Sequence, residues 1–215
     1  MFLESFSDVI IALCDRYMGR GIEAINYITN IYTKHKYIQG GLPWVTIGAG
    51  MVIVYYEQNE LTKAKKLCET LLPYLNYTCV TEVITNVYLS LSRLLFNEGD
   101  RKKSIRVLDQ LDRILMHGRY DRFNSQSMFE LMRQSYISSD GVRAKVIVLD
   151  NELCKEDAFN VAVDGDYVEL YERRSLALCY GLCLKGEYDQ AIDVLSVVLT
   201  KLKPLGIVSR TLVVE

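Results

Sequence analysis

Hydrophobic and polar residues follow one another along most of this chain with the spacing of amphipathic α-helices. Between residues 61 and 72 the apolar side chains recur every third or fourth position, and lysines and a glutamate occupy the opposite face. The same stripe returns between residues 105 and 115. The spacing predicts helices at residues 6–17, 22–35, 44–57, 61–75, 79–97, 101–116, 121–138, 141–152, 166–184 and 188–202, and an eleventh that begins near 207.

Short polar breaks separate these helices two by two. The breaks begin at Gly19, Asn59, Gly99, Ser139 and Gly186, which lie 40, 40, 40 and 47 residues apart. Five residues after each break begins there is a small residue, and eight residues after it a large, mostly aliphatic one. The small residues are Ala24, Ala64, Ser104, Ala144 and Ala191. Columns that keep one register indicate a repeat of about 40 residues, built as helix A, a tight turn and helix B.

We therefore predict an all-α fold, a right-handed superhelical solenoid of about five helix-turn-helix repeats similar to the tetratricopeptide repeat (TPR), forming one domain over residues 1–215. The small residue suits the point where helix B crosses helix A closely. Residues 145–149 are rich in β-branched side chains and alone would predict a strand. The repeat register favours a helix there, and we assign the seven extra residues before the last repeat to a linker over 155–165.

Composition narrows the range of functions. With 25 Lys plus Arg against 27 Asp plus Glu the net charge is −2, so the chain lacks the basic excess of a nucleic-acid-binding domain. The N-terminus carries acids instead of a basic secretory start, and the longest apolar stretch, residues 45–56, is too short to span a bilayer. The six cysteines lie inside apolar helical segments, a distribution typical of free thiols in a reducing compartment. We expect a cytoplasmic protein with no membrane partner.

Three segments resemble one family of regulators. They are Tyr55-Tyr56-Glu57-Gln58-Asn59-Glu60-Leu61-Thr62-Lys63-Ala64, Leu94-Leu95-Phe96-Asn97-Glu98-Gly99-Asp100 and Leu182-Cys183-Leu184-Lys185-Gly186-Glu187-Tyr188-Asp189-Gln190-Ala191. The first is similar to the Tyr-Glu-x-Asn-Asp-Leu stretch of the MalT-like, large ATP-binding LuxR-type transcriptional activators, although Gln58 and Glu60 depart from the commonest forms. The second is similar to that family's Leu-Leu-x-x-x-Gly-Asp and the third to its Leu-x-x-x-Gly-x-x-x-Glx-Ala. The Gly-Asp turns alone would suit any TPR protein. The resemblance covers roughly residues 40–215.

This resemblance implies a multidomain cytoplasmic activator in which a superhelical sensor receives an inducer or a regulatory protein. An ATPase would precede the sensor and a helix-turn-helix would follow it. The sequence holds no Gly-x-x-x-x-Gly-Lys-Ser/Thr motif, so we expect no cofactor in this chain, with ATP bound only by a missing N-terminal domain and DNA only by a missing C-terminal one. We also expect self-association through the helix that begins near 207, because its apolar residues have no following helix to cover them.

Two columns of the aligned repeats suggest an effector site. Three residues before the breaks at 59, 99 and 139 stand the aromatic residues Tyr56, Phe96 and Tyr136, and six residues before the last two stand Arg93 and Arg133. Both columns fall on A helices, which line the concave surface of this repeat type. The arginines could hold a carboxylate or phosphate between aromatic walls. In the alternative interpretation the aromatic residues are core and nearby acids, such as Glu57 or Glu130, neutralise the arginines.

No pairing of a nucleophile with a base stands out, so we do not expect an enzyme. Cys179 and Cys183 lie four residues apart on one helical face, but no further Cys or His accompanies them, and zinc takes four ligands. The leading hypothesis is a sensor and protein-interaction domain of a LuxR-type activator that transmits its signal allosterically. The alternative is a stand-alone TPR scaffold that docks peptides or proteins.

Overall fold

The computed structural model describes residues 2–36, 39–75, 80–118, 126–138 and 168–205, and every regular element among them is helical. The α-helices are α1 (Phe2–Tyr17), α2 (Gly21–Lys34), α3 (Leu42–Glu57), α4 (Leu61–Leu75), α5 (Thr81–Asn97), α6 (Arg101–Gly118), α7 (Gln126–Ile137), α10 (Val168–Lys185) and α11 (Tyr188–Leu202). A short 3-10 helix, η3 (Lys203–Leu205), follows α11. The all-α prediction is confirmed.

The periodicity also places the helix ends well. Helices α4 and α11 have the predicted bounds, and the others end within two residues of the predicted position. The first helix begins four residues earlier than predicted, at Phe2. The first five residues of the helix predicted over 121–138, the helix predicted over 141–152, the linker over 155–165 and the helix beginning near 207 lie outside the described residues.

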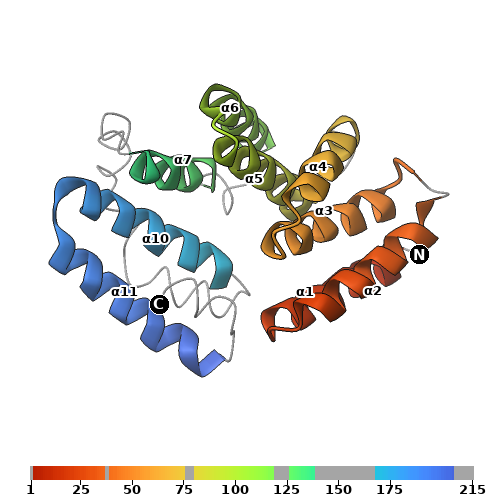
Figure 1. Cartoon of the computed structure of the whole chain (residues 1–215), viewed down its shortest axis with the longest axis horizontal. Helices are drawn as coiled ribbons and strands as arrows, with labels where there is room; N and C mark the ends of the chain where they lie inside the picture. The colour runs from red at the N-terminus through yellow and green to blue at the C-terminus, as the bar shows by residue number, and fades with distance from the viewer. Residues whose placement is uncertain (1, 37–38, 76–79, 119–125, 139–167, 206–215) are drawn as a thin grey trace. The chain divides into compact units, whose positions relative to one another are not determined.

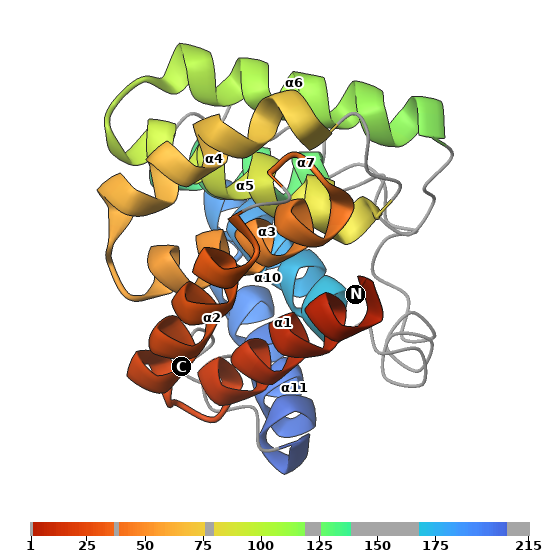
Figure 2. The same ribbon diagram turned by 90° about the vertical axis from the view of Figure 1, so that its right-hand side faces the viewer.

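The chain divides into two compact units, residues 1–124 and 125–215. In the first unit α1, α3 and α5 are the A helices; each packs against its own B helix, α2, α4 or α6, and α3 also packs against both α1 and α5. Both α4 and α6 lie on the same side of α3 and α5 (Figures 1 and 2). In the second unit α7 packs against α10, and α10 against α11. The single domain over 1–215 remains a prediction.

The turns between paired helices share one backbone geometry. Their turn residues Gly19, Asn59, Gly99 and Gly186 all adopt the left-handed conformation, with φ between 60° and 84°. In each turn the N–H of that residue bonds to the carbonyl three positions back, and the next N–H to the carbonyl five positions back, at 2.8–3.1 Å. This is the Schellman arrangement, which satisfies the last carbonyls of helix A and reverses the chain into helix B.

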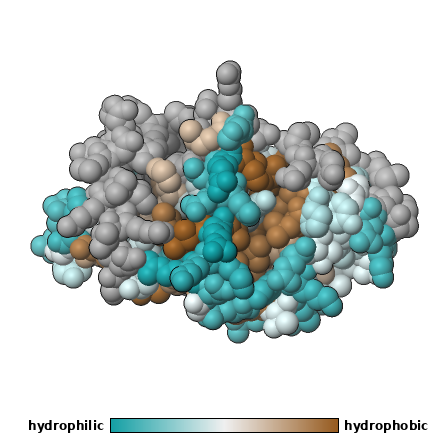
Figure 3. Space-filling model, turned by 90° about the horizontal axis from the view of Figure 1, so that it is seen from above, coloured by the Kyte–Doolittle hydropathy of each residue, from teal (hydrophilic) through white to brown (hydrophobic). Residues whose placement is uncertain are grey.

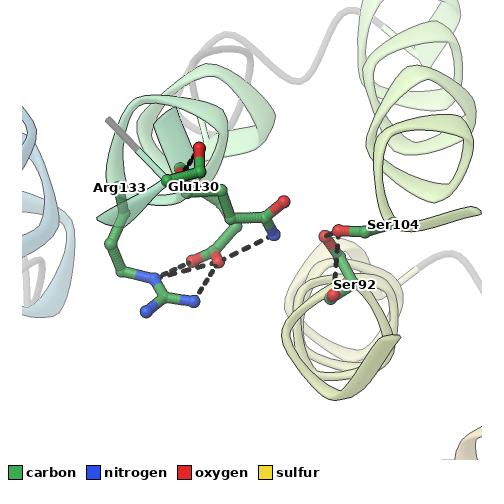
Figure 4. Close-up of polar contacts among 6 residues, drawn as sticks. Ser92, Ser104, Glu130 and Arg133 are labelled. Atoms are coloured by element: carbon green, nitrogen blue, oxygen red, sulfur yellow. Dashed lines mark hydrogen bonds and ion pairs between the residues drawn. The ribbon is translucent and has the colours of Figure 1, made fainter. Parts of the chain in front are cut away.

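Small residues lie where paired helices cross. Four members of the predicted small column, Ala24, Ala64, Ser104 and Ala191, are buried, and the fifth lies outside the described residues. The Ser104 hydroxyl lies 2.9 Å from the Ser92 hydroxyl and 2.9 Å from its carbonyl oxygen (Figure 4). At the same register the Cys179 thiol approaches the Ala191 carbonyl oxygen at 3.7 Å. A larger side chain in this column would push the two helix axes apart.

The turn geometry predicts unequal effects of substitution at two matched positions. Replacing Gly99 by alanine is expected to lower the free energy of unfolding by about 1 kcal/mol, because an L-residue is strained at positive φ. A Cβ at Gly99 would meet nothing within 4 Å, so the strain comes from the backbone alone. Replacing Asn59 by glycine is expected to change stability by only a few tenths of a kcal/mol. Urea unfolding followed by circular dichroism measures both, and an unchanged Gly99→Ala midpoint would contradict the strain argument.

Candidate interaction surface

The A helix α5 is buried on every side except one. Its residues that are not buried are Glu82, Asn86, Arg93, Phe96 and Asn97. These five, here called the α5 stripe, are spaced four, seven, three and one residues apart and therefore fall on one face of the helix, roughly 100° wide. Near the end of the neighbouring α3, Ile53, Tyr55 and Tyr56 are half-buried and Glu57 is exposed. Helices α3 and α5 therefore present a surface of mixed polar and aromatic character there.

An ion pair joins the first two A helices beside this surface. Arg16 Nε of α1 lies 2.6 Å from Glu57 Oε2 of α3, and the Arg16 guanidinium lies 4.2 Å from the centre of the Tyr17 ring. Arg16 is buried, although it stands three residues before its turn, the position that Tyr56 and Phe96 occupy in the next repeats. This register position is therefore structural in the first repeat. Glu57, named as a neutralising acid from the sequence, pairs with Arg16 across the α1–α3 contact.

In the second unit a carboxylate on α7 organises a polar network (Figure 4). Arg133 Nη2 donates to Glu130 Oε1 at 2.7 Å and Arg133 Nε to both carboxylate oxygens at 3.0 and 3.2 Å. Gln134 Nε2 donates to Glu130 Oε1 at 3.1 Å. The Glu130 side chain is 2% exposed and that of Arg133 22%. Arg133 is thus not the unpaired cation of the effector hypothesis, because one helical turn brings the buried acid into reach.

The two aromatic positions of the second unit lie against each other. The rings of Tyr136 on α7 and Tyr180 on α10 stack with their centres 5.1 Å apart and 24° between their planes. Tyr136 stands three residues before its break and Tyr180 six residues before the next turn residue, so residues from the two columns meet across neighbouring A helices. The Tyr136 side chain keeps one side open to solvent.

The five predicted site residues divide between the units. Tyr56, Arg93 and Phe96 are half-buried on α3 and α5 of the first unit, and Arg93 is not without a partner. Arg133 and Tyr136 belong to the second unit, one ion-paired and the other stacked. The effector groove on these five residues therefore remains a prediction.

An aromatic cluster in the first unit was not predicted. Trp44, at the start of α3, stacks on Tyr32 with ring centres 5.5 Å apart and meets the edge of Tyr74 at 5.6 Å. Burial raises the pKa of Tyr32 to about 12. Trp44 Nε1 has no hydrogen-bond partner among the described residues. The one tryptophan of the sequence was the only available signal, because helical periodicity does not show which aromatic side chains meet.

The cysteine thiols differ in their exposure to solvent. Cys68 and Cys179 are buried free thiols and Cys183 is half-buried, but Cys14 is exposed, against the expectation from its apolar segment. Burial raises the pKa of the Cys68 thiol to about 12, so it stays protonated at neutral pH.

No group of three or more metal-ligating side chains occurs in the described part of the chain. No helix in that part is long and apolar enough to cross a membrane. On the face drawn in Figure 3 hydrophobic area lies beside a hydrophilic strip.

Comparison with known proteins identifies the fold of the chain but no family to which it belongs. No family model matches the chain, and no curated protein matches it. Two solved structures resemble it, both of the nearly identical TPR-like repeats of a putative kinesin light chain from Podosopora anserina. The first, a single-residue variant of that protein, has a TM-score of 0.58 at 14% identity and covers 89% of this chain and 91% of its own. The second has a TM-score of 0.57 at 14% identity and covers 89% and 92%.

The fold is therefore that of a TPR-like helical-repeat protein. The repeat register, the Schellman turns and the small column at the helix crossings account for that architecture at the level of single residues. At 14% identity the two solved structures bear on the architecture alone.

Proposed function

We propose that this chain is a protein-interaction scaffold, and not a catalyst, that binds a segment of a partner protein along the α5 stripe. The observation that carries the proposal is the confinement of all exposed and half-buried residues of α5 to that one face. A helix packed on its other sides holds such a stripe rigidly, which limits the entropy lost on binding. TPR-like repeats are typically non-catalytic scaffolds, which supports the same conclusion.

The chemistry of the stripe favours an extended peptide. Asn86 and Asn97 are eleven residues apart, about 16 Å along the helix axis, which matches roughly five residues of extended chain. Amide side chains can donate to backbone carbonyls and accept from backbone N–H groups. Phe96 offers an apolar contact, and Arg93 and Glu82 favour a peptide that carries both an acid and a base. We expect modest affinity, because the surface is narrow.

Selection of peptides from a displayed random library, followed by fluorescence anisotropy, tests this proposal. We expect peptides that bind the wild-type chain and lose at least tenfold in affinity to the variants Phe96→Ala and Asn86→Ala. Met116→Ala is the matched control, because Met116 is an exposed apolar residue on the B helix α6 of the same unit. Failure to select any peptide, or peptides that bind both stripe variants like the wild type, would overturn the proposal.

A second candidate, the sensor of a MalT-like LuxR-type activator, is favoured by one observation, the sequence resemblance around residues 55–64. Asn59 in that segment forms the left-handed turn, a role that asparagine fills well. In this proposal the chain works in the cytoplasm and takes a small-molecule inducer or a regulatory protein, while ATP and DNA are bound by other domains.

A thermal-shift screen of small molecules against the chain tests this candidate. A ligand that binds the native state must raise its melting temperature. We expect Arg93→Met to abolish the shift produced by an anionic effector while Met116→Ala keeps it. A screen that finds no stabilising ligand would count against the sensor function and would not contradict the scaffold function.

A further inference from the structure

The B helices α2 and α4 each use one face to meet the A helix of the next repeat. A Cβ built on Gly50 of α3 would lie 3.1 Å from Ile28 of α2, and one on Gly48 would lie 3.3 Å from Tyr32. In the following pair the Cys68 thiol of α4 lies 3.8 Å from the Val87 carbonyl oxygen of α5. Counted from the turn residue, Ile28 and Cys68 share the ninth position and Tyr32 stands at the thirteenth. These positions define the forward face of a B helix.

Helix α11 leaves part of its forward face exposed. The positions two, six, nine and thirteen residues after Gly186 are Tyr188, Ile192, Leu195 and Leu199, all on one side of the helix. Tyr188 is 62% exposed and Ile192 59%, and both leucines are partly buried. No A helix follows α11 in the described part of the chain. The part of this apolar face nearest the turn, Tyr188 and Ile192, is therefore open, whereas Leu195 and Leu199 are partly covered.

Helix α1 exposes the complementary face. The A helices α3 and α5 bury the residues that stand eight and five positions before their turn residues. These are Met51 and Val54 in α3, and Leu91 and Leu94 in α5, on the same side of the helix as Val87. The equivalent residues of α1, Ile11 and Cys14, are exposed, Ile11 to 47%. Within the first unit the Gln58 side chain lies against Gly21. Gln58 stands one residue before the turn residue Asn59, and Gly21 stands two residues after the turn residue Gly19. The same register would place the exposed Met18 of α1 opposite Tyr188 of α11.

We propose that copies of this chain associate head to tail, with α11 of one copy docked on α1 of the next. The contact would continue between molecules the packing of a B helix on the following A helix that recurs twice inside the first unit. Ile192 and Tyr188 of one copy would be covered by Ile11 and Met18 of the other, and none of these four side chains carries a charge. The two faces differ, so the contact is heterologous and does not close at two copies. It uses neither the α5 stripe nor a peptide partner.

Light scattering coupled to size exclusion, over a concentration series of the full chain, tests the proposal. The weight-average mass of the wild type is expected to rise with concentration to at least twice the monomer mass. Ile11→Arg and Ile192→Arg should each remain monomeric, because a guanidinium would be buried in an apolar contact. Val197→Arg is the matched control: Val197 is an exposed apolar residue on the opposite face of α11, and this variant should associate like the wild type.

Mixing the two arginine variants distinguishes this arrangement from others. Ile11→Arg keeps an intact α11 and Ile192→Arg an intact α1, so the mixture should form dimers and nothing larger. Association of Ile11→Arg alone would indicate an α11–α11 contact and overturn the proposal. A wild type that stays monomeric at millimolar concentration would also overturn the proposal. So would a chain that associates only after residues 206–215 are removed, because those residues would then cover α11 themselves. Circular dichroism of each variant checks that it is folded.

Discussion

Replacing Arg133 by methionine is expected to lower the free energy of unfolding by about 3–5 kcal/mol, the range observed when one partner of a buried ion pair is removed. The Glu130 carboxylate is almost fully buried and accepts three hydrogen bonds from this guanidinium. Methionine keeps much of the apolar stem volume, so the loss comes mainly from the missing charge. Urea unfolding followed by circular dichroism measures the effect.

A double variant supplies the control for this experiment. Glu130→Leu combined with Arg133→Met removes both charges, and we expect it to recover most of the stability lost in Arg133→Met alone. A single variant that loses less than about 0.5 kcal/mol would show that the pair behaves like an exposed ion pair. The expected loss also matters for function, because a reduced ligand response of Arg133→Met would reflect unfolding unless its melting is measured alongside.

Replacing Trp44 by alanine is expected to cost about 3–5 kcal/mol, since it removes a large aromatic side chain from a packed core. Trp44 is 2% exposed and contacts the rings of Tyr32 and Tyr74. The cavity would open between α2, α3 and α4, so the first unit should lose cooperativity. Because the variant has no tryptophan left, unfolding must be followed by circular dichroism instead of fluorescence.

Phenylalanine at position 44 is the matched control. Trp44→Phe keeps an aromatic ring against both tyrosines and removes an N–H that has no hydrogen-bond partner among the described residues. Burying a donor without a partner costs about 1–3 kcal/mol, so its removal offsets part of the lost ring area. We expect Trp44→Phe to lose no more than about 1–2 kcal/mol. Equal losses in the two variants would show that the indole nitrogen is bonded.

The architecture was predictable because the same residue types recur at the same positions in successive repeats. Four of the five breaks place a glycine or asparagine at one register position, and there the structure has the left-handed residue of a Schellman turn. The small column at 24, 64, 104 and 191 likewise marked the helix crossings. These features depend on residues within one helix pair, so periodicity and spacing are enough to locate them.

The sequence by itself determined the helices, the turns and the face on which each residue lies. Only the tertiary structure decided which neighbours each residue meets on that face. Arg16 and Phe96 share a register position, yet one is buried against Glu57 and the other lies in the half-open α5 stripe. The paired state of Arg133 and the exposure of α1 and α11 also depend on what packs beside them. A side chain's burial and charge balance are set by residues distant in the sequence, and helical periodicity carries no information about those.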